Sequence, residues 1–270
     1  MTSPHVTKVG HLTLTTWSDG GLDIPAEYFP NATLKTPTVR FGANLWQIDA
    51  GARQILIDTG SGVFLKERFA DTGRVNDALG AGGIDPDSIT DIIITHMHAD
   101  HIGGLLKDGE PAFPNATIHL SGVEWGFWTD PELASRMPDE MAPMIGLIQM
   151  IAGKVADQVT PHDGAADLGN GISLLPAPGH TPGHVAVQII AGGETLLILG
   201  DALVSGDVQL ENPDVTYQLD ADPALAVAKR KALLARIADD GLRFAATHLP
   251  HPGLGRLTRR GDAYEFVPAS

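Results

Sequence analysis

Apolar residues recur along the chain in short runs that either alternate with polar residues or form continuous blocks, as they do in half-buried and fully buried strands. Strands are predicted wherever such a run is bounded by turn-forming residues, and these segments are 11–17, 43–50, 54–57, 91–94, 116–120, 172–175, 185–190, 195–199 and 244–247. Two pairs are typical of hairpins, one turning at Gly51 and the other across Ala191-Gly192-Gly193. The pattern therefore predicts extensive β-sheet.

Apolar residues spaced three and four apart predict helices between these strands. The helical segments are 74–79, a short helix capped by Ser121, 142–157 and 223–238. No linker, repeat or low-complexity stretch interrupts the alternation. We therefore expect an α/β protein in which residues 1–270 form a single domain.

The segment 131–157 departs from this regular alternation. Apolar residues recur in it at steps of four and three: Met137, Met141, Met144, Ile148, Ile151 and Val155. Pro138 and Pro143 prevent one continuous helix, although Pro143 suits the first turn of a helix that begins near 142. Methionine fills gaps in cores and also suits adaptable surfaces. Two interpretations stay open: a core helix, or a helical insertion that serves as a lid or homodimer face, with Met141 and Met144 lining a substrate pocket.

No clear period appears from 22 to 42, where three prolines interrupt the chain. We therefore expect a long loop, with 23–42 mobile, because long loops in compact domains are usually functional or mobile. Tyr28 and Phe29 on this loop either cover a pocket or pack on the core, and core packing is slightly favoured.

Composition narrows the choice of function. There are 18 basic and 33 acidic residues among 270, a net charge of −15. This charge repels polyphosphate and anionic membranes, so we expect a small-molecule substrate and neither nucleic acid nor a membrane as partner. Because cysteine is absent, a metal must be bound by histidine and aspartate. No apolar run reaches transmembrane length and the first 20 residues lack a signal-peptide pattern, which predicts a cytoplasmic protein.

The strongest chemical signal is the segment Thr95-His96-Met97-His98-Ala99-Asp100-His101. It follows the predicted buried strand 91–94. Because residues two apart in an extended chain point the same way, His96 and His98 should face one point. Imidazole and carboxylate together favour zinc and similar divalent metals. The segment therefore predicts a metal site.

This segment resembles the H-x-H-x-D-H signature of the metallo-β-lactamase superfamily. Three later motifs resemble the same family and come in the same order: Gly179-His180-Thr181-Pro182-Gly183-His184, Gly200-Asp201 and Thr247-His248. The resemblance covers nearly the whole chain. It implies an αβ/βα sandwich, in which two mixed β-sheets are flanked by helices and a metal site lies at one edge.

Carried over position by position, the resemblance implies two divalent metal ions, with zinc the first candidate and iron, manganese or cobalt as alternatives. It implies three ligands for each metal and one that bridges them: His96, His98 and His180 for the first, Asp100, His101 and His248 for the second, and Asp201 for both. A hydroxide shared by the two metals would attack a carbonyl carbon or a phosphorus. Asp100 would also carry a proton to the leaving group.

The resemblance gives roles to further residues. Asp58 would orient a ligand histidine, although an Asx-turn that ends a strand is an equally simple interpretation. His184 would support the site without binding metal, and His251 would line the substrate pocket or pack beside Pro252. Some lactonases of the superfamily carry a tyrosine three residues after the bridging aspartate. Val204 stands there in this chain, and we assign it to the pocket.

Within the superfamily, the chain most resembles the group of methyl parathion hydrolase and the N-acyl-homoserine lactonases, and Val204 favours the former branch. This resemblance implies a hydrolase of a small neutral lactone, carboxylic ester or phosphotriester. Two alternatives stay open: a thioester hydrolase similar to glyoxalase II, and a metal-binding module without catalysis. The short tail after His248 disfavours the first, because glyoxalase II carries a helical domain there, and the complete ligand set disfavours the second.

Overall fold

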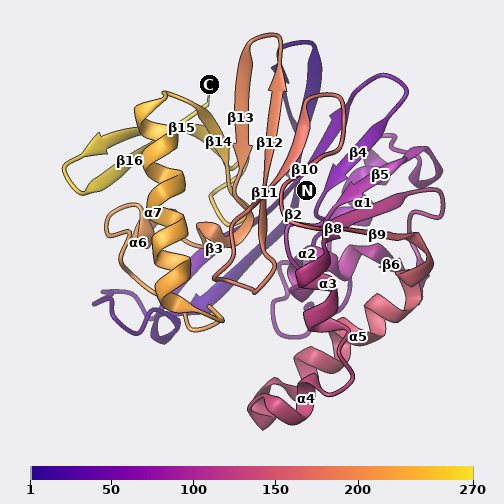
Figure 1. Ribbon diagram of the computed structural model, residues 1–270, viewed down its shortest axis with the longest axis horizontal. Coiled ribbons are helices and arrows are strands. Elements are labelled where there is room, and N and C mark those ends of the chain that lie inside the picture. Colours follow the sequence, from indigo (N-terminus) through magenta and orange to yellow (C-terminus); the bar gives the residue numbers. More distant parts are fainter. Residues whose placement is uncertain (1, 270) are drawn as a thin grey trace.

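Two seven-stranded β-sheets lie face to face in the computed structural model, which describes residues 2–269, and helices cover the outer face of each sheet (Figure 1). The N-terminal part of the chain forms the first sheet and the C-terminal part forms the second. The predicted sandwich of two mixed sheets with flanking helices is thus confirmed.

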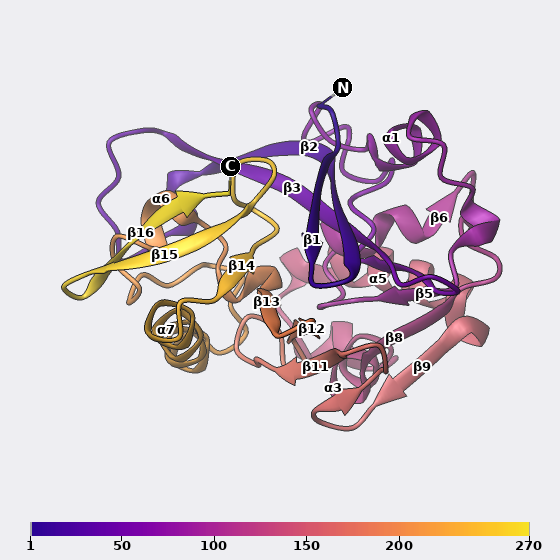
Figure 2. The same cartoon turned by 90° about the horizontal axis from the view of Figure 1, so that it is seen from above.

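The first sheet has the strand order β1-β2-β3-β4-β5-β8-β9, antiparallel as far as β4 and parallel beyond it. Its strands are β1 (His5–Val9), β2 (Leu12–Pro25), β3 (Thr38–Asp49), β4 (Gln54–Ile57), β5 (Asp91–Ile93), β8 (Thr117–Ser121) and β9 (Val159–His162). Seen from above, β2 and β3 extend across the molecule toward the side of the second sheet (Figure 2).

The second sheet follows the order of the sequence and is antiparallel except where β13 pairs with β14. Its strands are β10 (Ala166–Asp167), β11 (Ile172–Pro176), β12 (Val185–Ala191), β13 (Glu194–Ile198), β14 (Arg243–Ala245), β15 (Leu254–Arg260) and β16 (Ala263–Pro268). A separate small ribbon is formed by β6 (Leu106–Lys107) and β7 (Glu110–Pro111).

The helices of the described residues are mostly short: α1 (Val75–Ala81), α2 (Ala99–Ile102), α3 (Gly122–Trp128), α4 (Leu133–Arg136), α5 (Ala142–Val155), α6 (Gly206–Gln209) and α7 (Pro223–Asp239). The longest, α7, begins where Asp222 accepts a hydrogen bond from the amide of Leu225 at 3.0 Å and Pro223 occupies the first turn. Between residues 2 and 269 no helix is long and apolar enough to cross a membrane.

Alternation along the strands divides the apolar side chains between separate cores. Ile57 and Ile93 face the second sheet and pack in the layer between the sheets. Their neighbours Leu56 and Ile92 point the other way, into the core beneath α1, α3 and α5. A third core lies between the second sheet and α7.

The 142–157 helix is confirmed within two residues at its end, and α5 buries Ile145, Ile148 and Ile151 in the first-sheet core. α5 therefore packs on the core, as one of the two interpretations expected, and a lid role for 131–157 stays a prediction. Met141 and Met144 are only half buried and remain available to a neighbouring cavity. A homodimer face in 131–157 stays a prediction.

The predicted loop at 22–42 is too long at both ends. β2 continues to Pro25 through a β-bulge, and β3 begins at Thr38, so only 26–37 lie outside the two strands. Glycines and prolines here indicated turns, but the glycines lie at a β-bulge, and β2 continues to pair with β3 beyond it. Phe29 is buried as favoured, and the mobility of the loop stays a prediction.

Some elements gave no usable pattern in the sequence. β1, β9, β10 and the hairpin of β15 and β16 lie toward sheet edges, where few side chains are buried and alternation is weak. Ser121 is the N-cap residue of α3, as predicted, although its side chain makes no capping hydrogen bond.

An ion pair between Arg53 and Asp91 connects the start of β4 with β5, where the parallel part of the first sheet begins. Arg53 donates to both carboxylate oxygens of Asp91, at 2.6 and 3.0 Å. Burial alone would raise the pKa of Asp91, but hydrogen bonds from Arg53, Thr90 and His119 outweigh it and lower the pKa to about 2. A carboxyl group whose pKa is lower in the folded protein stabilises the fold at pH values above its pKa in the unfolded chain. This contribution is lost as the pH falls towards 2.

We therefore expect Asp91→Asn to lower the free energy of unfolding by about 1–3 kcal/mol near neutral pH, because a charged pair of hydrogen bonds is lost. The difference between wild type and variant should shrink as the pH is lowered from 6 to 3. Urea denaturation of both metal-free proteins at each pH measures it. A difference that does not change with pH would show that the charge on Asp91 contributes nothing to stability.

Candidate metal centre

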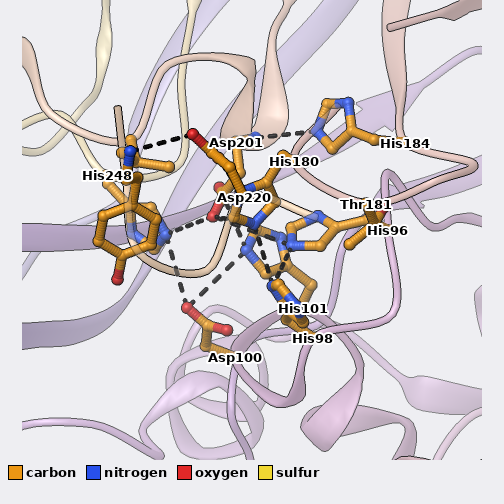
Figure 3. Close-up of polar contacts among 12 residues, drawn as sticks. His96, His98, Asp100, His101, His180, Thr181, His184, Asp201, Asp220 and His248 are labelled. Atoms are coloured by element: carbon orange, nitrogen blue, oxygen red, sulfur yellow. Dashed lines mark hydrogen bonds and ion pairs between the residues drawn. The ribbon is translucent and has the colours of Figure 1, made fainter. Parts of the chain in front are cut away.

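All seven predicted ligands lie at the same end of the two sheets, in the turns next to strands. β5 leads into the turn that carries His96 and His98, and α2 then presents Asp100 and His101. Asp201 follows β13, and His248 follows β14. His180 precedes β12, which is antiparallel to β13 and so begins at the same end. Figure 3 shows these side chains converging.

A first group contains three histidines that are almost completely buried. His98 Nδ1 lies 3.0 Å from His96 Nε2 and 3.0 Å from His180 Nε2. These three atoms could hold one metal ion. The group is the set that the resemblance implied for the first metal.

A second group adds a carboxylate. Asp100 Oδ2 lies 3.5 Å from His248 Nε2 and 3.8 Å from His101 Nε2, and these atoms could also hold a metal. Asp201 stands between the groups: its Oδ1 lies 3.3 Å from His101 Nε2 and its Oδ2 lies 3.4 Å from His180 Nε2. The structure therefore brings all seven residues together in the arrangement that was predicted.

The chemistry of these donors fits a divalent metal. His101 Nε2 and Asp201 Oδ1 are buried polar atoms without a hydrogen-bond partner among the described residues, and such orphans call for an explanation. Burial, together with neighbouring histidines, holds the pKa of His96 and His98 well below the ordinary value. These rings therefore stay neutral and keep a lone pair for a metal.

Partners outside the cluster fix the orientation of three ligand rings. His101 Nδ1 lies 2.8 Å from Asp58 Oδ2, and His180 Nδ1 lies 2.9 Å from Asp220 Oδ1. His248 Nδ1 lies 2.8 Å from the carbonyl oxygen of Gly42. Each contact gives the outer nitrogen an acceptor for its proton and turns the inner nitrogen toward the cluster. The position of Asp58 agrees with the orienting role predicted for it.

His184 lies behind the cluster and belongs to none of the three groups that could hold a metal. Its Nε2 accepts a hydrogen bond from the amide of Asp201 at 3.0 Å. Burial and the nearby His180 lower the pKa of His184 to about 3, so the ring stays neutral and keeps this acceptor. Its position agrees with a supporting role.

A cavity of about 590 Å³ opens onto the cluster, with His98, Asp100, His180, Asp201 and His248 in its wall. Most other lining residues are apolar, and they come from β2, β3, the segment 64–69, α5 and the segment 217–219. Arg68 and Glu140 are the ionised side chains of the wall outside the cluster, in the part of the chain that the structure describes.

Of the four residues assigned to a substrate pocket, two line this cavity and two do not. Met141 and Met144 line the cavity, as does Tyr28. Val204 is buried in a cluster with Val208 and Val215 because its side chain turns away from the cavity. His251 hydrogen-bonds Asn44 and the carbonyl oxygen of Ser3, which hold it away from the pocket.

Sequence reasoning missed two residues beside the site. Asp220 accepts from His180, and its other oxygen accepts from the amide of Tyr217 at 3.0 Å. The ring of Tyr217 stacks on that of His180, with centroids 6.1 Å apart, and lines the cavity. Nothing in the pattern distinguishes Asp220 from the acidic residues around it. Its place just before the predicted α7 was the available signal.

A family model described as the metallo-beta-lactamase superfamily matches residues 39–248. Among curated proteins, the probable metallo-hydrolase Mb2322c of Mycobacterium bovis is 27% identical over 180 residues, which are 55% of this chain and 52% of that protein. The chain thus spans about half the length of the first curated relatives that it matches.

Two solved structures are similar over nearly the full length. One is AidC, described as a dizinc quorum-quenching lactonase in complex with its product, with a TM-score of 0.91 and 29% identity over 99% of this chain and 98% of that one. The other is the hydrolase AbOPH, with a TM-score of 0.91 and 28% identity over 100% and 98% of the two chains.

We expect the wild-type protein to bind about two metal ions per chain when it is purified without chelator, because the carboxylate of Asp201 lies close to histidines of both groups. His98→Ala and Asp201→Ala should each lose metal, whereas His162→Ala should not. His162 contacts His119 on the neighbouring strand, so it is a control for histidine loss outside the cluster. Elemental analysis measures all four proteins, and metal loss from His162→Ala would show that the ligand assignment is wrong.

Proposed function

The chain belongs to the metallo-beta-lactamase superfamily, and on that premise we propose that it is a metal-dependent hydrolase of small neutral esters. Lactones are the first substrate class, and carboxylic esters and phosphotriesters are the others. We propose His96, His98 and His180 as ligands of one divalent metal and Asp100, His101 and His248 as ligands of a second, with Asp201 shared. Zinc is the first candidate, although this donor set also accepts iron, manganese or cobalt.

The observation that carries the proposal is the position of the ligand cluster in the wall of a mostly apolar cavity. An apolar wall favours a neutral substrate with a hydrocarbon substituent, because burying that surface is favourable. The carboxylates of Asp100 and Asp201 and the net charge of −15 on the chain make the pocket unsuitable for polyanions. The similarity to a lactonase and to another hydrolase of the superfamily supports the same substrate classes.

When bound, two divalent metal ions would lower the pKa of a shared water and polarise the carbonyl or phosphoryl oxygen of the substrate. Asp100, which is partly exposed to the cavity, would carry a proton to the leaving oxygen. Burial, followed by the negative charges of Asp100 and Asp201, raises the pKa of Tyr217 well above the ordinary value. Its phenol therefore stays protonated and can donate a hydrogen bond to a substrate in the cavity.

A substrate panel on the metal-loaded protein tests the proposal. It contains lactones of several acyl lengths, aryl esters, phosphotriesters and a glutathione thioester. We expect turnover of at least one neutral ester class, with KM falling as the acyl chain lengthens because apolar wall is buried against it. Preference for the glutathione thioester would favour the glyoxalase II-like alternative. Metal binding without turnover of any substrate would favour a non-catalytic module and refute the hydrolase proposal.

Asp100→Asn separates the two roles proposed for Asp100. The amide keeps one oxygen ligand but cannot transfer the proton, so with metal in excess the rate should still fall by about 10²–10⁴-fold for alkyl lactones. The loss should be smaller for nitrophenyl esters and phosphotriesters, whose leaving groups depart unprotonated. Steady-state kinetics on both substrate kinds measure this contrast. Equal losses that added metal fully restores would show that Asp100 is a ligand alone.

A further inference from the structure

Glu124 is a completely buried carboxylate that belongs to none of the metal-binding groups. Its Oε1 accepts hydrogen bonds from the amide of Met97 and from Trp128 Nε1, both at 2.8 Å. Its Oε2 accepts from Thr181 Oγ1 at 2.7 Å and from the amide of Gly183 at 3.0 Å. Both oxygens are therefore fully engaged, and every donor belongs to the protein.

The donors reveal what this carboxylate connects. Met97 lies between His96 and His98, whereas Thr181 and Gly183 lie in the turn that contains His180. The two segments come from different sheets: one follows β5 and the other precedes β12. Glu124 therefore joins the two turns that carry the whole first ligand group, and among the described residues none of its hydrogen bonds goes to the turns of Asp201 or His248.

The packing around this bridge is tight. A Cβ added at Gly183 would lie 2.1 Å from the backbone nitrogen of Glu124, so the turn approaches α3 as closely as only glycine allows. Trp128 donates to the same carboxylate, and its ring meets the ring of His98 edge-on, with centroids 5.6 Å apart. Helix α3 thus supports the first ligand group through a hydrogen-bonded bridge and an aromatic contact.

We propose that Glu124 is a positioning residue that holds these two turns at the separation the first metal requires before the metal binds. Inner nitrogens that lie 3.0 Å apart repel one another unless a proton or a cation lies between them. Without a bridge the turns would relax apart, and metal binding would have to draw them back together. The inference concerns a site named under the proposed function and rests on it.

Glu124→Gln is the sharpest test, because an amide keeps the size of the side chain but can accept at only one of its two ends. We expect the first site to bind Co²⁺ about 10–100-fold more weakly, as for other residues that orient ligands, with little change at the second site. Competition with a chelator, followed by Co²⁺ absorption, measures both sites. In the metal-free protein, hydrogen exchange at the amides of Met97 and Gly183 should also accelerate.

Asp19→Asn is the matched control. Asp19 is also a completely buried carboxylate, and it accepts from the amides of Ser61, Gly73, Arg74 and Val75 and from the hydroxyl of Ser61. None of its donors lies in the turns of the first ligand group. We therefore expect a loss of stability from Asp19→Asn without a change in first-site affinity.

If Glu124→Gln does not fold, Thr181→Val removes one donor with little change in shape and should weaken the same site to a smaller extent. A variant of Glu124 or Thr181 that folds and binds Co²⁺ as the wild type does would overturn the positioning role while leaving the proposed function intact. A wild-type protein that binds no Co²⁺ would overturn the proposed function, and this inference with it.

Discussion

In the first ligand group, His98 Nδ1 lies 3.0 Å from both His96 Nε2 and His180 Nε2, and one proton at His98 Nδ1 can satisfy only one of the two contacts. Such an arrangement is unfavourable without a cation, so the surrounding fold must impose it. The constraint comes from outside the group: Asp220 contacts the outer nitrogen of His180, and Glu124 accepts hydrogen bonds from the two turns that carry the three histidines. The strands fix the backbone positions of the ligand residues, and acceptors outside the cluster fix the orientations of the ligand rings.

The positions of the site residues along the chain explain which parts of the site the sequence could predict. His96, His98 and His101 follow a run of buried isoleucines at fixed spacing, so one continuous segment contains the information. His180, Asp201 and His248 became identifiable through the resemblance of their motifs. Asp220 and Glu124 act across the tertiary structure, and no local pattern distinguishes a carboxylate that accepts from a distant turn from one that faces water.

The elements of the fold likewise divide into those that the sequence predicted and those that it did not. Strands in the centre of the sheets, such as β4, β5 and β13, were predicted because burial on both faces leaves continuous apolar runs. The edge strands and the C-terminal hairpin bury fewer side chains, so their pattern is weak. β2 was cut short because its glycines resembled a turn, although a bulge within a paired strand has the same composition. Val204 and His251 were misplaced because distance along the chain from a ligand does not tell which way a side chain turns.

The cavity has two unlike walls, and this difference bears on how the substrate range of the protein can change during evolution. One wall is β2 and β3, where Phe41 precedes Gly42, the residue that orients His248 and also donates its amide to the His248 carbonyl oxygen. Another part of the wall is α5, whose Met144 and Leu147 line the cavity and belong to no metal-binding group. Substitutions on the strands would disturb the histidine and aspartate cluster and the cavity together, whereas substitutions of Met144 or Leu147 would change the cavity wall at residues that belong to no metal-binding group. If the proposed function is right, changes in substrate preference should therefore accumulate on the helix more readily than on the strands.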